Sequence, residues 1–251
     1  MDIDGSVAIV TGASRGIGAE ITRALSERHA HVIALGIEAD ELAKTAADVG
    51  AEAFVADVRD PAHADAVVQH ALDRYGRLDI VVANAGIGHS GDFAVMPPAR
   101  IGDLVAINVT APMLLARAAI PAMLEARRGS LVFISSIAGA LLVPTETVYS
   151  STKAAVDGFA EPLREELRGT GVHVSTIVPA VVRTKFFETR GEPYERKFPR
   201  MIGPERIAAA VVDAVEHDTK RRLVPRWISV PIRLRGIAPA SYRAISRRFG
   251  G

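Results

Sequence analysis

The sequence predicts an α/β fold in which one doubly wound parallel sheet is covered by helices on both faces. Short apolar runs alternate with longer segments of helical period along the chain. The apolar runs show no polar alternation, which is typical of parallel strands buried on both sides. The 251 residues are 49% hydrophobic, and no linker rich in proline and glycine divides them, so we expect a single domain.

Six apolar runs are the predicted strands, and six segments of helical period are the predicted helices. The strands are expected at residues 7–10, 32–35, 54–56, 80–83, 131–134 and 174–178. The helices are expected at residues 17–27, 41–49, 62–75, 104–126, 154–168 and 204–216. Residues 180–203 have no clear period and contain Pro193 and Pro199, which predicts a loop or lid.

Composition excludes several classes of protein. The net charge of +1 favours neither a nucleic-acid partner nor an acidic one, so no nucleic-acid partner is expected. The chain has no cysteine, which excludes disulfides, thiolate catalysis and zinc–thiolate sites. The N-terminus is acidic and leads directly into a strand, so no signal peptide is predicted. No uninterrupted apolar run reaches the roughly 18 residues that span a bilayer. We therefore expect a cytoplasmic protein.

The first predicted strand leads into a glycine-rich turn, TGASRGIG at residues 11–18. Backbone N–H groups at a helix N-terminus bind pyrophosphate, and glycines let the phosphate and the helix approach closely. An ordinary strand–turn–helix connection has the same pattern, but ANAG at residues 83–86 ends the neighbouring fourth strand. We therefore predict a dinucleotide site formed by Gly12, Ser14, Arg15, Gly16, Ile17, Gly18, Asn84, Ala85 and Gly86.

Asp57 follows the third predicted strand. Its carboxylate either accepts a hydrogen bond from an adenine amino group or caps a turn. The position alone favours neither role, so both stay open at this point.

Tyr149 and Lys153 are four residues apart and share one face of a helix. An ammonium group near the phenol lowers its pKa from about 10, so that the phenol exchanges a proton with an alkoxide. Ser136, at the end of the fifth strand, would hydrogen-bond the substrate oxygen. Asn108 lies in a helical segment that asparagine disfavours, where it could free a carbonyl for water. Taken singly, each also fits a solvated helix or a strand end.

In combination, these residues resemble the short-chain dehydrogenase/reductase family, over residues 5 to about 224. The motifs stand in family order as TGASRGIG (11–18), Asp57, ANAG (83–86), Asn108, Ile134-Ser135-Ser136 and YSSTK (149–153). The resemblance implies a Rossmann-like sheet of about seven strands. Residues 1–225, including the lid, would then be a dinucleotide-binding and catalytic domain, followed by a basic C-terminal extension at residues 226–251.

The resemblance also implies roles for single residues. Tyr149 would be the acid and base, and Ser136 would polarise the substrate oxygen. Lys153 would hold the nicotinamide ribose and lower the tyrosine pKa, and Asn108 would support a water relay. The implied cofactor contacts also include Tyr149, Lys153, Asp57, Val58, Asn84 on the adenosine side, and Val182 and Thr184 on the carboxamide side.

One position departs from the family pattern. Pro-Gly usually follows the sixth strand, but this chain has Pro179-Ala180. We expect the entry to the lid to differ as a result.

The cofactor is expected to be NADP(H), with NAD(H) as the alternative. Members that prefer NAD carry an acid at the end of the second strand, where this chain has Gly36. Arg15 in the glycine-rich turn could pair with a 2′-phosphate. Against this, Ile37 stands where many NADP-preferring members carry arginine, and Glu38 is close by.

The predicted substrate walls lie at residues 87–93, at residues 137–143 and in the lid at Phe186 and Phe187, and Leu141, Leu142 and Val143 among them are apolar. No buried cationic clamp is evident. We therefore expect an apolar ketone or secondary alcohol, although these side chains could instead pack the lid or a subunit interface. His89 is interpreted as a surface residue.

The C-terminal extension is basic. No acidic residue follows Asp218, while Trp227, Ile228 and further apolar residues are interspersed among arginines. The extension either contacts a membrane surface with anionic lipid or folds against the domain or a second subunit.

The leading hypothesis is an NAD(P)-dependent carbonyl reductase or alcohol dehydrogenase that forms a dimer or tetramer, with a homotetramer expected by resemblance. The alternatives are a catalytically silent cofactor-binding regulator and a structural partner of the same fold. The presence of all four of Asn108, Ser136, Tyr149 and Lys153 argues against the regulator.

Overall fold

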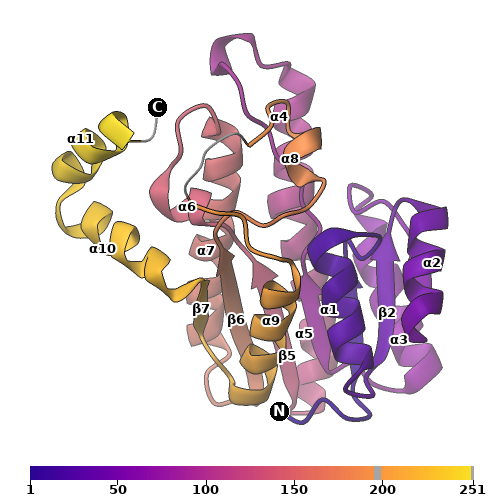
Figure 1. Cartoon of the computed structure of the whole chain (residues 1–251). Helices are drawn as coiled ribbons and strands as arrows, with labels where there is room; N and C mark the ends of the chain where they lie inside the picture. The colour runs from indigo at the N-terminus through magenta and orange to yellow at the C-terminus, as the bar shows by residue number, and fades with distance from the viewer. Residues whose placement is uncertain (195–198, 250–251) are drawn as a thin grey trace.

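The computed structural model describes residues 1–194 and 199–249, with side chains up to residue 244 (Figure 1). Seven parallel strands form one sheet in the order β3-β2-β1-β4-β5-β6-β7. The strands are β1 (Val7–Thr11), β2 (His31–Gly36), β3 (Glu52–Val55), β4 (Ile80–Ala83), β5 (Gly129–Ile134), β6 (Val172–Pro179) and β7 (Arg221–Val224). The order reverses between β1 and β4, where a crevice opens at the carboxyl edge. The predicted doubly wound sheet is confirmed.

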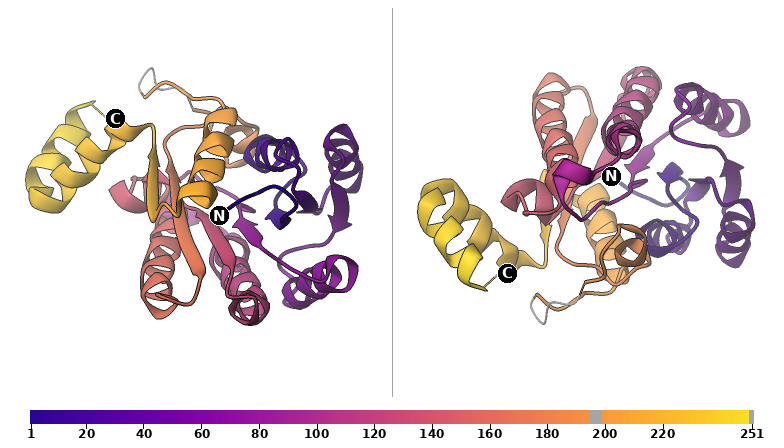
Figure 2. Two further views of the ribbon diagram at one scale, coloured as in Figure 1. Left: turned by 90° about the horizontal axis from the view of Figure 1, so that it is seen from below. Right: turned by 90° about the horizontal axis from the view of Figure 1, so that it is seen from above.

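Helices cover both faces of the sheet, as the two end-on views of Figure 2 show. On one face, a core cluster joins the strands to α1 (Gly16–Ser26), α2 (Ala39–Val49) and α9 (Glu205–His217). On the other, a second cluster joins them to α3 (Ala62–Tyr75), α5 (Ala111–Glu125) and α7 (Thr147–Glu166). Neighbouring residues of one strand alternate between the clusters, as the pleat requires: Ala8 and Val10 belong to the first, Val7 and Ile9 to the second.

The remaining elements surround the crevice. The structure adds η1 (Phe93–Val95), α4 (Pro98–Val105), the π-helix η2 (Ala106–Thr110), α6 (Ile137–Leu141), α8 (Phe186–Thr189), η3 (Arg226–Ile228), α10 (Ser229–Ile237) and α11 (Pro239–Phe249). We call residues 226–249 the C-terminal arm. It extends beyond β7, with α10 and α11 side by side in every view (Figures 1 and 2).

Three elements differ from the prediction: one strand, one helix start and one divided helix. The strand β7 was not predicted because Arg221 and Arg222 interrupt its apolar pattern at the sheet edge. The helix expected at 154–168 begins at Thr147, so it includes the Tyr–Lys pair. The helix expected at 104–126 is three pieces, since a π turn separates α4 from α5.

The helical run Pro98–Glu125 is long and apolar enough to cross a bilayer by length and composition alone. The sequence did not predict this because charged residues interrupt the run. Its α5 portion packs against α3 and against β4 and β5, so part of its apolar surface belongs to the second core cluster. The same composition is typical of a core helix.

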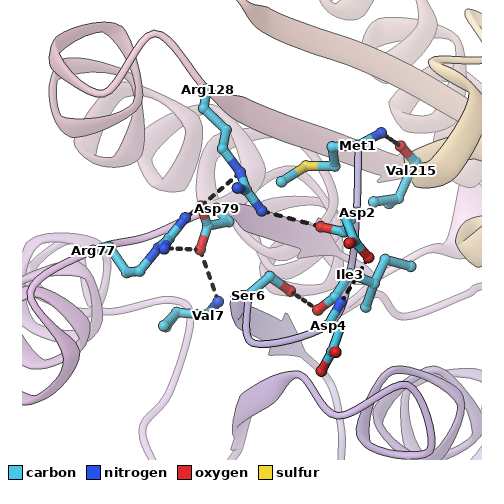
Figure 3. A network of polar contacts seen from close by, with 10 residues as sticks. All are labelled: Met1, Asp2, Ile3, Asp4, Ser6, Val7, Arg77, Asp79, Arg128 and Val215. Carbon is cyan, nitrogen blue, oxygen red and sulfur yellow. Dashed lines mark hydrogen bonds and ion pairs between the residues drawn. The ribbon is translucent and has the colours of Figure 1, made fainter.

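A polar network ties the strands together at the amino edge, opposite the crevice (Figure 3). Asp79 is buried, accepts a hydrogen bond from the backbone N–H of Val7 at 2.9 Å, and pairs with Arg77 at 2.7 Å and Arg128 at 3.2 Å. The N-terminal ammonium of Met1 donates to the Val215 carbonyl at 2.6 Å. A buried carboxylate is stable here because both charged and backbone donors surround it.

Candidate active site

A cleft of about 1230 Å³ lies at the carboxyl edge of the sheet, between the glycine-rich turn and the lid. Of the predicted site residues, those that line it are Gly12, Ser14, Arg15, Gly16, Ile17, Asp57, Val58, Asn84, Ala85, Gly86, Ser136, Tyr149, Lys153, Val182 and Thr184. Gly18 and Asn108 lie behind its wall. The structure therefore places most of the predicted residues around one cleft, and their roles stay predictions.

The glycine-rich turn is held against the end of β4. Gly12 has φ +65°, and a Cβ there would lie 2.8 Å from the Cα of Ala85. A Cβ on Gly18 would lie 2.1 Å from the carbonyl oxygen of Gly12, so Gly18 permits helix packing rather than cofactor contact. Asn84 Nδ2 donates to the Thr11 carbonyl at 2.9 Å and the Gly12 carbonyl at 3.2 Å. Asn84 therefore fixes the turn.

The turn fits a dinucleotide phosphate. Helix α1 begins at Gly16, and Gly16 and Ile17 line the cleft, so the first turn of the helix, whose N–H groups lack partners within the helix, lies at the cleft. Ser14 Oγ is buried and has no hydrogen-bond partner among the described residues. A buried hydroxyl without a partner is costly, and a ligand oxygen would satisfy it.

Arg15 is paired in the structure, which the sequence did not predict. Its guanidinium lies 3.0 Å from the carboxylate of Glu38 and 3.0 Å from that of Glu41. The arginine holds the pKa of Glu41 below its usual value. A Cβ on Gly36 would lie 2.3 Å from Ser14 Oγ, so an acid at this position would not fit. Any 2′-phosphate must compete with two carboxylates for Arg15.

Asp57 caps its own turn. It accepts a hydrogen bond from the backbone N–H of Arg59 at 2.9 Å and pairs with the guanidinium of Arg59. These contacts hold the pKa of Asp57 below its usual value. Of the two roles left open by the sequence, the structure shows the cap. The carboxylate still lines the cleft.

Tyr149 and Ser136 form the reacting pair at the cleft floor. Tyr149 is buried on α7, and the Ser136 hydroxyl is among the groups that act on the pKa of its phenol. The hydroxyl oxygen of Ser136 accepts from the backbone N–H of Ala138 at 3.1 Å, which leaves its own hydrogen free to donate. Burial raises the pKa of Tyr149, and Ser136 offsets this only in part. The phenol therefore carries its proton at neutral pH.

The charges that act on the pKa of Tyr149 in this structure are Glu146 and Arg190, and the lowering of that pKa by Lys153 stays a prediction. Burial lowers the pKa of Lys153 itself to about 8, and the carboxylate of Asp157 opposes that shift. The Lys153 ammonium donates to the carbonyl of Ile134 at 2.9 Å, and this bond fixes its position in the cleft. Both side chains titrate according to burial, which the sequence pattern does not report.

Asn108 lies in the π turn and is almost fully buried. Its side chain accepts from the backbone N–H of Ile87 at 2.9 Å and donates to the Ile87 carbonyl at 2.9 Å. It also donates to Thr152 Oγ1 at 3.0 Å. Asn108 thus joins the loop after β4 to helix α7. A surface location is excluded, and the water relay through its carbonyl stays a prediction.

The lid carries a buried cation that the sequence analysis missed. Arg190 is 8% exposed and forms an ion pair with Glu146, which lines the cleft. Glu146 raises the pKa of Tyr149 and Arg190 lowers it, so both charges act on the phenol. The Arg190 carbonyl accepts from the backbone N–H of Ser90 at 2.8 Å. No sequence signal joined these residues, because they lie on separate loops.

Backbone contacts hold the chain from Ala180 to Phe186 in place, on the expected nicotinamide side of the cleft. The backbone N–H of Ala180 donates to the carbonyl of Val224 at 2.8 Å, and Val182 forms a bridge with Ile202. Thr184 Oγ1 accepts from the backbone N–H of Phe186 at 3.3 Å. Alanine is thus accommodated where the family has glycine.

The substrate end of the cleft is mostly apolar. The rings of Tyr149 and Phe186 lie 5.4 Å apart, and Phe186 packs in turn on Phe187. The C-terminal arm forms the opposite wall, which the sequence did not assign to the site. Its lining side chains are Trp227, Val230, Pro231, Leu234 and Tyr242.

A family model for short chain dehydrogenases matches residues 6–195. The chain belongs to the short-chain dehydrogenase/reductase family. It is 33% identical over 259 residues to the ketoacyl reductase HetN of Nostoc sp., covering 99% of this chain and 90% of that protein. The family, the fold and the class of oxidoreductase expected from the motifs are thereby confirmed.

Two solved structures share this fold. A metagenomic short-chain oxidoreductase in complex with NADP has a TM-score of 0.77 and 32% identity, over 89% of this chain and 97% of the other. The 3-ketoacyl-(acyl-carrier-protein) reductase from Brucella melitensis, complexed with NADH, has a TM-score of 0.83 and 26% identity, over 88% and 97%. The cleft described above is therefore a site for a nicotinamide dinucleotide, NAD or NADP.

Proposed function

We propose that this enzyme interconverts an apolar ketone and the matching secondary alcohol, with Tyr149 as the proton donor and acceptor. One observation carries the proposal: a protonated phenol, with the Ser136 hydroxyl in the same lining, lies in a cleft with mainly apolar walls. The nicotinamide cofactor, bound along the glycine-rich turn, supplies or accepts the hydride. The HetN protein is named a ketoacyl reductase, and a ketoacyl group is an apolar chain bearing a ketone.

In the direction of reduction, the phenol of Tyr149 gives its proton to the carbonyl oxygen of the substrate as negative charge develops there. The free hydrogen of Ser136 orients and stabilises the same oxygen. In oxidation, Tyr149 takes the proton back. The buried cation Arg190 is paired with Glu146 of the cleft lining, so it does not make the cleft selective for an anion.

The preference for NADP(H) stays a prediction, and it is the finer part of the proposal. Arg15 must leave Glu38 and Glu41 to bind a 2′-phosphate, so NADPH and NADH should be compared by kcat/KM. Assembly into a dimer or tetramer also stays a prediction, which light scattering will test.

The Tyr149→Phe variant tests the chemistry. A screen of apolar ketones, followed by absorbance of the reduced cofactor, should find substrates for the wild type. Turnover of the variant should fall by about 10²–10⁴-fold, the usual contribution of a general acid. Calorimetry should show nearly unchanged cofactor binding, because the cradle is intact.

The matched control is Tyr75→Phe on α3, which removes a phenol hydroxyl remote from the cleft. It should keep full turnover. Wild-type turnover in Tyr149→Phe would refute the role of the phenol. A wild type that binds cofactor but turns over no ketone or alcohol would favour the silent regulator instead.

A further inference from the structure

The C-terminal arm presents apolar side chains to solvent on its outer surface. Ile237 is 85% exposed, Val230 66% and Trp227 42%. The arm extends away from the sheet edge, and α10 reaches the body of the protein at α6 (Figures 1 and 2). Exposed apolar groups of this size, gathered on one short segment, are typical of an interaction surface.

The same segment carries unpaired positive charge. Arg226, Arg233 and Arg243 are exposed, and none of them has an ion-pair partner among the described residues. No acidic residue follows Asp218 in the sequence. By contrast, Arg221 and Arg222 on β7 are neutralised by carboxylates of α7 and α9. The arginines of β7 are therefore paired, whereas these three arginines of the arm are not.

The arm is also a wall of the cleft. Leu234 and Tyr242 line it, and Arg235 anchors α10 by donating to the Ala140 carbonyl at 2.7 Å. Trp227 and Val230 line the cleft as well as being exposed. The apolar lining of the cleft is thus continuous with the apolar surface outside, at the arm.

We propose that the C-terminal arm binds the surface of a bilayer that contains anionic lipid, with the mouth of the cleft at that surface. Apolar residues between exposed arginines match the boundary of acyl chains and headgroups, where both groups are satisfied at once. An acidic protein would pair with the arginines but would leave the exposed isoleucine and valine less completely buried. The proposal concerns binding and needs no turnover, so it stands or falls apart from the proposed function.

The test is flotation of the full chain with vesicles of phosphatidylcholine and phosphatidylserine, and with vesicles of phosphatidylcholine alone. The wild type should float with the first and remain largely unbound with the second. In the triple variant Arg226→Gln/Arg233→Gln/Arg243→Gln, binding should weaken on the order of 100-fold, at about fivefold for each arginine near the surface.

A charge-matched control keeps the net charge of that variant and leaves the arm intact. Lys44→Gln/Arg117→Gln/Arg206→Gln removes three exposed cations from α2, α5 and α9. It should float like the wild type. The Ile237→Ser variant tests the apolar part and should bind several-fold more weakly than the wild type.

Trp227 gives a second readout because it is the single tryptophan of the chain. Its fluorescence should shift to the blue on addition of anionic vesicles and should be quenched by brominated acyl chains. Circular dichroism and turnover of a water-soluble ketone will show that the variants are folded.

Three results would overturn the proposal. They are equal flotation of the triple variant and its control, equal binding to vesicles with and without phosphatidylserine, and Ile237→Ser that binds as tightly as the wild type. If light scattering showed that Ile237→Ser dissociates an oligomer while the wild type does not float, the arm would be a subunit contact.

Discussion

Replacing Asn108 with alanine should loosen the loop after β4 and lower stability by a measurable amount. The change removes three hydrogen bonds and leaves the N–H and the carbonyl of Ile87 without their protein partners. Each buried backbone group left unsatisfied costs about 1–3 kcal/mol. Ile87 is half-buried beside the cleft, where water reaches it, so we expect a total of about 2–4 kcal/mol. For a chain of this size the melting temperature should fall by about 5–15 °C.

Urea unfolding at fixed protein concentration will measure the free energy, and amide hydrogen exchange at Ile87 will report the local effect. The control is Thr152→Val, which removes one of the three partners and leaves both bonds to Ile87 intact. It should cost less than half as much. An Asn108→Ala variant within about 0.5 kcal/mol of the wild type would refute the reasoning, since that is the usual range for a surface substitution. So would a control that is equally destabilised.

Four further outcomes follow from the structure. Burial lowers the pKa of Lys153 to about 8, so the unfolded chain binds more protons than the folded chain above that pH. The free energy of unfolding should therefore rise by about 2 kcal/mol from about pH 8 to pH 10, relative to the Lys153→Met variant. Urea unfolding that gives the same pH dependence for both proteins would contradict this. Because burial raises the pKa of Tyr149, the rate of ketone reduction should not change with pH near neutrality, while the rate of alcohol oxidation should rise through the alkaline range. An oxidation rate that reaches its plateau below about pH 8 would contradict this prediction. Glu38→Gln or Glu41→Gln should raise kcat/KM for NADPH relative to NADH by up to about fivefold, because each variant removes one carboxylate partner of Arg15. An unchanged ratio would mean that Arg15 does not contact the cofactor. Asp79→Ala should lower the free energy of unfolding in urea by about 2–4 kcal/mol, because Arg77 and Arg128 lose their partner. Its kcat should not change, because this network lies at the edge of the sheet opposite the cleft.

The predictable part of the fold is the part in which burial and sequence pattern coincide. Strands such as Ile80–Ala83 are buried on both sides, so their apolar runs identify them directly. The edge strand β7 has only one neighbour and tolerates Arg221 and Arg222, which conceal it. The π turn could not be predicted either, because the pattern of residues 106–110 fits an α-helix as well as a π-helix.

The site could be predicted where motifs follow the strands in a fixed order, and not where distant loops meet. Ser136, Tyr149 and Lys153 line one cleft because a strand end and one helix position them. Burial raises the pKa of Tyr149 and lowers that of Lys153, and a four-residue spacing carries no information on burial. The pairing of Glu146 with Arg190 depends on how the lid lies over α7, and no local pattern encodes that.

The π turn at Ala106–Thr110 can be regarded as a single-residue insertion in one long helix. Deleting one residue within this turn would restore a continuous α-helix and leave α4 and α5 in their present register. An α-helix turns about 100° per residue, so a deletion within α5 would instead rotate everything N-terminal to it by that angle. Leu104, fully buried in the present register, would swing toward solvent, and the amide of Asn108 would lose its alignment with Ile87. A change of length should therefore be tolerated far better inside the π turn than in α5.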